Sequence, residues 1–245
     1  EKKSMYNPKS KNAEEFICHD EVLASLEYAE QNKNNLEVIN KILEKARLKK
    51  GLSHREAAVL LDCTIPEKVE EIFALAREIK QEYYGNRIVL FAPLYLSNYC
   101  VNGCVYCPYH HINKHIPRVK LTQEQIKREV EALQDMGHKR IAIEAGEDPV
   151  NNPIEYILDS IKTIYSVKHK NGAIRRVNVN IAATTVENYK KLHEAGIGTY
   201  ILFQETYNKE TYEKLHPTGP KHNYKYHTEA MDRAMEAGID DVSLG

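Results

Sequence analysis

Three cysteines lie within eight residues of the sequence, at Cys100, Cys104 and Cys107. Cysteine thiolates are the usual ligands of iron–sulfur clusters and also bind zinc. Because the three thiols share one short loop, each can bind one iron of a four-iron cubane. The fourth iron then has no protein ligand and is open to a small molecule.

A structural zinc ion is the alternative use of these thiols. Such a site has four protein ligands, usually supplied by pairs of cysteines two residues apart. Only Cys104 and Cys107 form such a pair here. A fourth ligand is available from a nearby histidine: His110, His111 or His115. We therefore keep a non-enzymatic zinc-binding module as an alternative.

The sequence around and after the cysteines alternates between strand and helix character. Apolar segments typical of strands lie at 88–96, 140–145, 176–182, 199–204 and 240–245. Segments of helical periodicity separate them at 122–136, 153–168, 186–195 and 223–237. This alternation predicts an α/β fold with a parallel sheet. The cysteine loop follows the first strand, on the side where the active sites of (βα) barrels lie.

The first third of the sequence is predicted to be helical. Its helices are expected at 20–31, at 35–50, from the Ser53–Glu56 capping box, and from Pro66 to Gly85. We expect two domains, an N-terminal helical region at 1–85 and a barrel at 86–245. A complete eight-fold barrel takes about 250 residues, so this part has room for about five βα units. We therefore expect a partial TIM-like barrel, incomplete at its C-terminus, and a natural protein longer than this sequence.

The composition favours a small-molecule substrate. Lysine and arginine number 34, against 35 aspartates and glutamates, so there is no net field to attract nucleic acid or an anionic membrane. No apolar run reaches 18 residues, and the charged N-terminus lacks the apolar core of a signal peptide. We expect a cytoplasmic protein that binds neither nucleic acid nor membrane. Two further cysteines, Cys18 and Cys63, are expected to be small core residues.

The cysteine loop, with Tyr106 directly before its last cysteine, resembles that of the radical S-adenosylmethionine (SAM) superfamily. Within it, the chain is similar to the tyrosine lyases of iron–iron hydrogenase maturation, more closely than to the thiamine-pathway tyrosine lyases. The similarity extends to about residues 85–245. Its further motifs are Pro108-Tyr109, 113–116, Arg118, 144–149, 204–207 and 242–245.

The resemblance implies roles for individual residues. Cys100, Cys104 and Cys107 would hold a 4Fe-4S cluster, whose fourth iron binds the amino and carboxylate groups of S-adenosyl-L-methionine. Gly103 would ease the tight loop by adopting a positive φ. The remaining cofactor-binding candidates are Tyr106 near the adenine, Ala145, Gly146 and Glu147 at the SAM ammonium, and Gln204 and Glu205 at the ribose or the substrate. No residue is assigned as the catalytic one.

The resemblance also implies a reaction and partners. L-tyrosine would be cleaved between Cα and Cβ to p-cresol and dehydroglycine (2-iminoacetate), after an electron from a donor such as ferredoxin or flavodoxin cleaves SAM. In hydrogenase maturation, dehydroglycine then yields carbon monoxide and cyanide at a second cluster in a C-terminal domain, in concert with other maturation proteins. No cysteine follows Cys107 in this sequence, so that second cluster has no cysteine ligands here. A thiamine-pathway tyrosine lyase is the second candidate.

Overall fold

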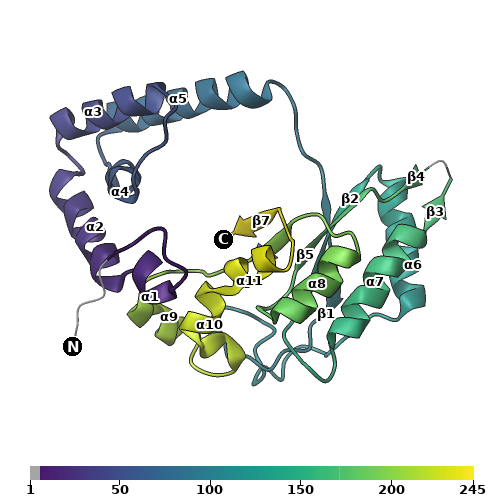
Figure 1. Cartoon of the computed structure of the whole chain (residues 1–245). Helices are drawn as coiled ribbons and strands as arrows, with labels where there is room; N and C mark the ends of the chain where they lie inside the picture. Colours follow the sequence, from purple (N-terminus) through teal and green to yellow (C-terminus); the bar gives the residue numbers. More distant parts are fainter. Residues whose placement is uncertain (1–5, 171) are drawn as a thin grey trace. The chain divides into compact units, whose positions relative to one another are not determined.

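The computed structural model describes residues 6–170 and 172–245. The chain divides into two compact units, whose main spans are residues 14–89 and 90–245 (Figure 1). The expected domain boundary after residue 85 stays a prediction. Among the described residues, no helix is both long enough and apolar enough to span a membrane.

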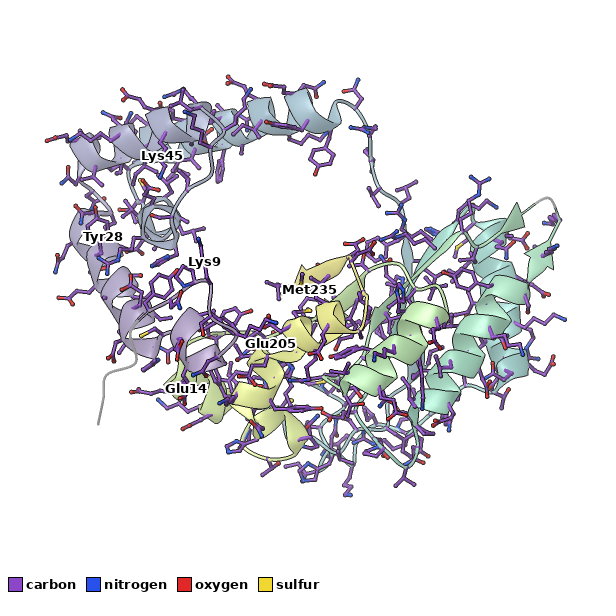
Figure 2. All side chains as sticks on the ribbon, viewed as in Figure 1. Lys9, Glu14, Tyr28, Lys45, Glu205 and Met235 are labelled. Atoms are coloured by element: carbon purple, nitrogen blue, oxygen red, sulfur yellow. The ribbon has the colours of Figure 1, made fainter. Side chains whose placement is uncertain are left out.

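The first unit is helical. Its helices are α2 (His19–Asn32), α3 (Leu36–Arg47), α4 (His54–Asp62) and α5 (Pro66–Tyr84), after the short α1 (Ala13–Phe16). The predicted capping box at Ser53 and Glu56 begins α4, and a proline begins α5. Apolar side chains such as Ile39, Leu43 and Val59 form the core of this unit. Lys45 on α3, which is labelled in Figure 2, also pairs with Glu56 at 2.7 Å.

The second unit contains a parallel sheet of five strands. In chain order and in sheet order these are β1 (Ala92–Ser97), β2 (Arg140–Ala145), β5 (Arg176–Asn180), β6 (Tyr200–Leu202) and β7 (Val242–Leu244). Each strand pairs in parallel with the next. This confirms the predicted α/β fold with its open, barrel-like parallel sheet.

Helices cover one face of the sheet. They are α6 (Gln123–Asp135), α7 (Ile154–Ser166) and α8 (Val186–Glu194), which lie together beside the strands in Figure 1. Leu94, Ile143 and Val179 lie at one level of neighbouring strands and are buried in the core that these helices share. Since side chains alternate along a strand, the residues between them face the other side of the sheet.

Some predicted elements differ from the structure. The first strand begins at Ala92, which pairs with Ile141, the second residue of β2. Residues 88–90 lie beyond the start of β2 and have no partner there, and the side chains of 88–91 are exposed. The helix expected at 223–237 is broken at Glu229 into α10 (Tyr224–Thr228) and α11 (Ala230–Glu236). Four further elements were not predicted: α9 (Lys209–Leu215), a 3-10 turn (Pro220–His222) and the two-residue strands β3 (Lys168–His169) and β4 (Gly172–Ala173).

Candidate cofactor site

The cysteine loop follows β1 and is held to two neighbouring segments by backbone hydrogen bonds. Val101 N donates to Glu147 O at 2.8 Å, which ties the loop to the end of β2. Gly103 N donates to Thr218 O and Val105 N to Leu215 O, both at 3.0 Å. These bonds fix the backbone of the loop before any cofactor binds.

Two glycines allow this close packing. A Cβ on Gly103 would lie 2.2 Å from Thr218 Oγ1, and a Cβ on Gly146 would lie 2.3 Å from Tyr99 O. Gly103 is not among the glycines with positive φ, so the expected backbone role of this residue was wrong. Its missing side chain makes room for Thr218 instead.

Asn102 connects the loop to the other parts of the site. Its side chain is buried; Nδ2 donates to Glu147 Oε2 at 2.6 Å, and Oδ1 accepts from Lys221 N at 2.9 Å. Its carbonyl accepts from His111 N at 2.9 Å. Asn102 therefore aligns the carboxylate of Glu147 with the cysteine loop.

These segments surround one pocket of about 220 Å³. The pocket brings together eight of the nine residues predicted to bind the cluster or SAM: Cys100, Cys104, Tyr106, Cys107, Ala145, Gly146, Glu147 and Glu205. Several other residues that line the pocket had no predicted role: Asn102, Tyr109, Asn180, Lys221 and His227.

The ninth residue, Gln204, lies beside the pocket rather than on its surface. Gln204 is 3% exposed. Its Nε2 donates to Thr228 Oγ1 at 3.0 Å, and its Oε1 accepts from His227 Nδ1 at 2.6 Å. His227 lines the pocket, and burial lowers its pKa to about 3, so its ring is neutral. Gln204 thus orients His227, and its predicted contact with ribose or substrate stays a prediction.

The three thiols form a donor set that fits an iron–sulfur cluster. Burial raises the pKa of Cys100 and of Cys104, and the nearby thiols raise it further. The Lys221 ammonium acts in the opposite direction on Cys104. Thiols in this environment ionise readily only when a metal takes the charge.

Among residues 6–170 and 172–245, no three His, Cys, Asp or Glu side chains are arranged to hold one metal ion. A cubane needs a wider arrangement, because each thiolate binds a different iron. The three thiols on one short, pinned loop meet that requirement. His111, one of the possible zinc ligands, has its Nδ1 3.1 Å from Asn102 O.

Glu205 and Lys221 form a charged pair at one side of the pocket. Glu205, which follows β6 and is labelled in Figure 2, has a φ of 69°, a region uncommon for residues other than glycine. Its Oε1 lies 3.5 Å from Lys221 Nζ. Lys221 Nζ also donates to Tyr106 OH at 3.1 Å, and that hydroxyl lies 2.9 Å from His216 Nε2. His216 Nδ1 donates to Tyr212 O, so Nε2 accepts from Tyr106.

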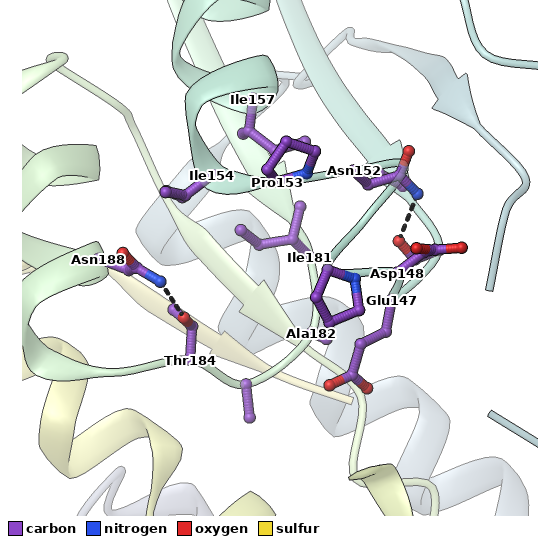
Figure 3. Close-up of a pocket in the computed structure, with 14 residues that line it drawn as sticks. Glu147, Asp148, Asn152, Pro153, Ile154, Ile157, Ile181, Ala182, Thr184 and Asn188 are labelled. Atoms are coloured by element: carbon purple, nitrogen blue, oxygen red, sulfur yellow. Dashed lines mark hydrogen bonds between the residues drawn. The ribbon is translucent and has the colours of Figure 1, made fainter. Parts of the chain in front are cut away.

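A second pocket adjoins the first at the ends of β2 and β5 (Figure 3). The two pockets share five residues: Ala145, Gly146, Glu147, Ile181 and Ala182. Asp148, next to Glu147, turns its carboxylate to Val150 N and Asn151 N at 2.9 and 2.8 Å. The two neighbouring carboxylates therefore have different roles. Asp148 stabilises a turn, whereas Glu147 contacts the cysteine loop through Asn102.

Comparison with known proteins agrees with this arrangement. Residues 94–245 match the model of the radical SAM superfamily. A crystal structure of HydG, a maturase of the FeFe-hydrogenase, matches with a TM-score of 0.90 and 62% identity, covering 94% of this chain and 50% of that chain. HydG from Carboxydothermus hydrogenoformans matches with a TM-score of 0.84 and 42% identity, covering 93% and 52%.

The 2-iminoacetate synthase of Salmonella typhimurium is 29% identical over 203 residues, which are 83% of this chain and 52% of that protein. The chain thus spans about half the length of these relatives. The superfamily match covers more than half of the chain and includes the cysteine loop. On this basis the chain belongs to the radical SAM superfamily, and it is closely related to HydG and to 2-iminoacetate synthase.

Proposed function

We propose that this chain forms the cluster-binding part of a radical SAM lyase that cleaves the Cα–Cβ bond of L-tyrosine. The products are p-cresol and dehydroglycine (2-iminoacetate). Because the deoxyadenosyl radical keeps the hydrogen atom that it removes from tyrosine, p-cresol takes up one proton and one further electron from the electron donor. The observation that carries the proposal is the 62% identity to HydG over 94% of the chain. It is supported by the single pocket that holds the three cysteines and Glu147.

Membership of the superfamily implies a 4Fe-4S cluster and SAM. When bound, these cofactors supply a carbon-centred radical that removes a hydrogen atom from the substrate. Cys100, Cys104 and Cys107 hold three of the irons. The hydrogen bonds from Val101, Gly103 and Val105 keep their loop in place while the cluster is loaded.

Glu147 is the residue that would bind the SAM ammonium group. Asn102 holds one carboxylate oxygen at 2.6 Å. Burial raises the pKa of Glu147, whereas the Asn102 hydrogen bond and the Lys221 charge lower it. A bound ammonium would favour the ionised form in the same way and form a charge-assisted hydrogen bond. Ala145 and Gly146 would offer backbone groups beside it, and Tyr106 would lie near the adenine.

The later steps involve partners. An electron donor such as ferredoxin or flavodoxin reduces the cluster, and dehydroglycine is converted to carbon monoxide and cyanide for the hydrogenase active site together with other maturation proteins. We assign that conversion to a second cluster outside these residues. The cytoplasm is the expected location.

Product analysis tests this proposal. Full-length protein with a reconstituted cluster is incubated anaerobically with SAM, dithionite and L-tyrosine, and p-cresol, dehydroglycine and cyanide are measured. All three are expected. Formation of p-cresol without cyanide would favour the thiamine-pathway lyase. The similarity to 2-iminoacetate synthase is the observation that supports this alternative. Protein that binds zinc and no iron would favour the zinc-binding module and contradict both lyases.

A further inference from the structure

A second carboxyl group, Glu144, faces the same pocket and has no role in the site described so far. In the sheet register Glu144 lies beside Tyr95 on β1 and Asn180 on β5. Its neighbours along β2 and β5, Ile143 and Val179, are buried against the helices. Glu144, Tyr95 and Asn180 therefore form a row on the opposite face of the sheet, and all three line the pocket.

Among residues 6–170 and 172–245, the partner that holds Glu144 is an amide, and no cation contacts it. Asn180 Nδ2 donates to Glu144 Oε2 at 2.6 Å. Burial raises the pKa of Glu144 to about 7, and the Asn180 hydrogen bond is the one opposing influence among the described residues. Glu144 also acts on Tyr109, whose pKa is raised by burial first, and then by Tyr95, Cys107 and Glu144. Tyr109 thus lies near both a cysteine of the cluster loop and Glu144.

The pocket is lined by both charged and aromatic side chains. Glu205 and Lys221, whose charged groups lie 3.5 Å apart, suit the ammonium and carboxylate groups of an amino acid. Two aromatic rings that line the pocket lie near Glu144, because Tyr95 is its neighbour on β1 and the pKa of Tyr109 is affected by its charge. An aromatic amino acid would place its charged groups at Glu205 and Lys221 and its ring beside Tyr95 and Tyr109. A hydroxyl group on that ring would meet Glu144.

We propose that Glu144 is the specificity-determining residue for the substrate ring, accepting a hydrogen bond from its phenolic hydroxyl while Asn180 holds the carboxyl group in place. This inference rests on the proposed function, because it concerns the side chain of the tyrosine substrate. It predicts discrimination between L-tyrosine and L-phenylalanine, since a site built to bind a hydroxyl group is left with an unpaired polar group when the hydroxyl is missing.

Binding measurements on full-length holoenzyme test the inference. Dissociation constants for L-tyrosine and L-phenylalanine are measured anaerobically by titration calorimetry, with SAM present and without reductant, so that no turnover occurs. Wild-type protein is expected to prefer tyrosine. In Glu144→Gln the affinity for tyrosine is expected to fall about tenfold, because a neutral amide is a weaker acceptor than a carboxylate, while the affinity for phenylalanine stays the same.

Two comparisons make the result specific. Glu187→Gln changes an 81%-exposed carboxylate on α8 and should keep the wild-type preference. Iron content and SAM affinity show whether Glu144→Gln is folded and loaded. If it is not, Glu144→Asp is used, in which the carboxylate is withdrawn by one methylene, and the same loss of preference is expected.

Three results would overturn the inference. A variant that prefers tyrosine as strongly as the wild type would exclude Glu144 as the phenol site and leave the proposed function intact. Equal losses for both amino acids would assign Glu144 to the ammonium group instead. Wild-type protein that binds no tyrosine would contradict the proposed function itself.

Discussion

At the scale of single residues, Asn102 explains how the site is held together. It lies between two cysteines in the sequence, yet its side chain bonds to Glu147 and to the backbone of Lys221, 45 and 119 residues away. The spacing of the cysteines predicts the loop, because the ligands are local. It says nothing about Asn102, since asparagine is common in loops and its partners are distant in the sequence.

Replacing Cys104 by alanine should abolish both cluster assembly and SAM cleavage. Cys104 is 7% exposed, and the two remaining thiols cannot hold a cubane with one open iron. Iron content and 5′-deoxyadenosine formation measure the effect. Cys63→Ala, a change in the core of the first unit, is the control and should keep the iron content of the wild type. Wild-type iron content and normal SAM cleavage in Cys104→Ala would show that the assigned ligands are wrong.

Glu147→Gln should weaken SAM binding and leave the cluster unchanged. The amide keeps an acceptor for Asn102 but loses the charge that would pair with the SAM ammonium. Charge-assisted hydrogen bonds contribute about 1.5–3 kcal/mol, so the affinity should fall about ten- to a hundredfold. Titration of SAM into the anaerobic protein measures it. With iron content as in the wild type, an unchanged SAM affinity would remove Glu147 from the cofactor site.

The pKa of Glu144 predicts how stability depends on pH. Burial raises it from 4.5 in the unfolded chain to about 7 in the folded protein. Between these values the folded state keeps a proton that the unfolded state has lost, so stability falls as pH rises through this window. In Glu144→Gln this loss of stability with rising pH is absent. With both proteins free of metal, the melting temperature of the variant should therefore exceed that of the wild type at about pH 8, with little difference near pH 4. A difference that does not change with pH would contradict the burial of the carboxyl group.

At the scale of elements, the sequence predicts the sheet well where hydrophobic periodicity is the cause. All five strands occur within the predicted segments or one residue beyond them, because their apolar faces pack against helices. The first strand was predicted too long, since the apolar residues 88–90 lie beyond the start of β2 and have no strand to pair with. Helix α9 was missed, because its seven residues carry too short a pattern.

The contact between the end of β2 and the cysteine loop should not tolerate a side chain. In Gly146→Ala the new Cβ would meet Tyr99 O at 2.3 Å and Cys100 Cβ at 2.9 Å. Because the first of these is a backbone atom, the loop must shift, and we expect reduced iron loading. Ala145→Gly, one residue earlier, is the control. Full iron content in Gly146→Ala would show that the loop position does not depend on this contact.

At the scale of the whole molecule, the candidate site is assembled from the ends of several strands. The residues after β1 and β2 could be predicted because their motifs are compact. Lys221, His216 and His227 could not, because they come from a segment of helices and turns beyond β6 whose packing depends on tertiary contacts.

The stoichiometry of the reaction tests the central claim most directly. Wild-type full-length protein is incubated anaerobically with SAM, dithionite and L-tyrosine, and 5′-deoxyadenosine and p-cresol are quantified together. If SAM cleavage in the pocket of Cys100, Cys104, Cys107 and Glu147 drives tyrosine cleavage, the two products should form in equal amounts, and Cys104→Ala should form neither. Formation of 5′-deoxyadenosine without p-cresol would contradict the assignment of this chain to a tyrosine lyase.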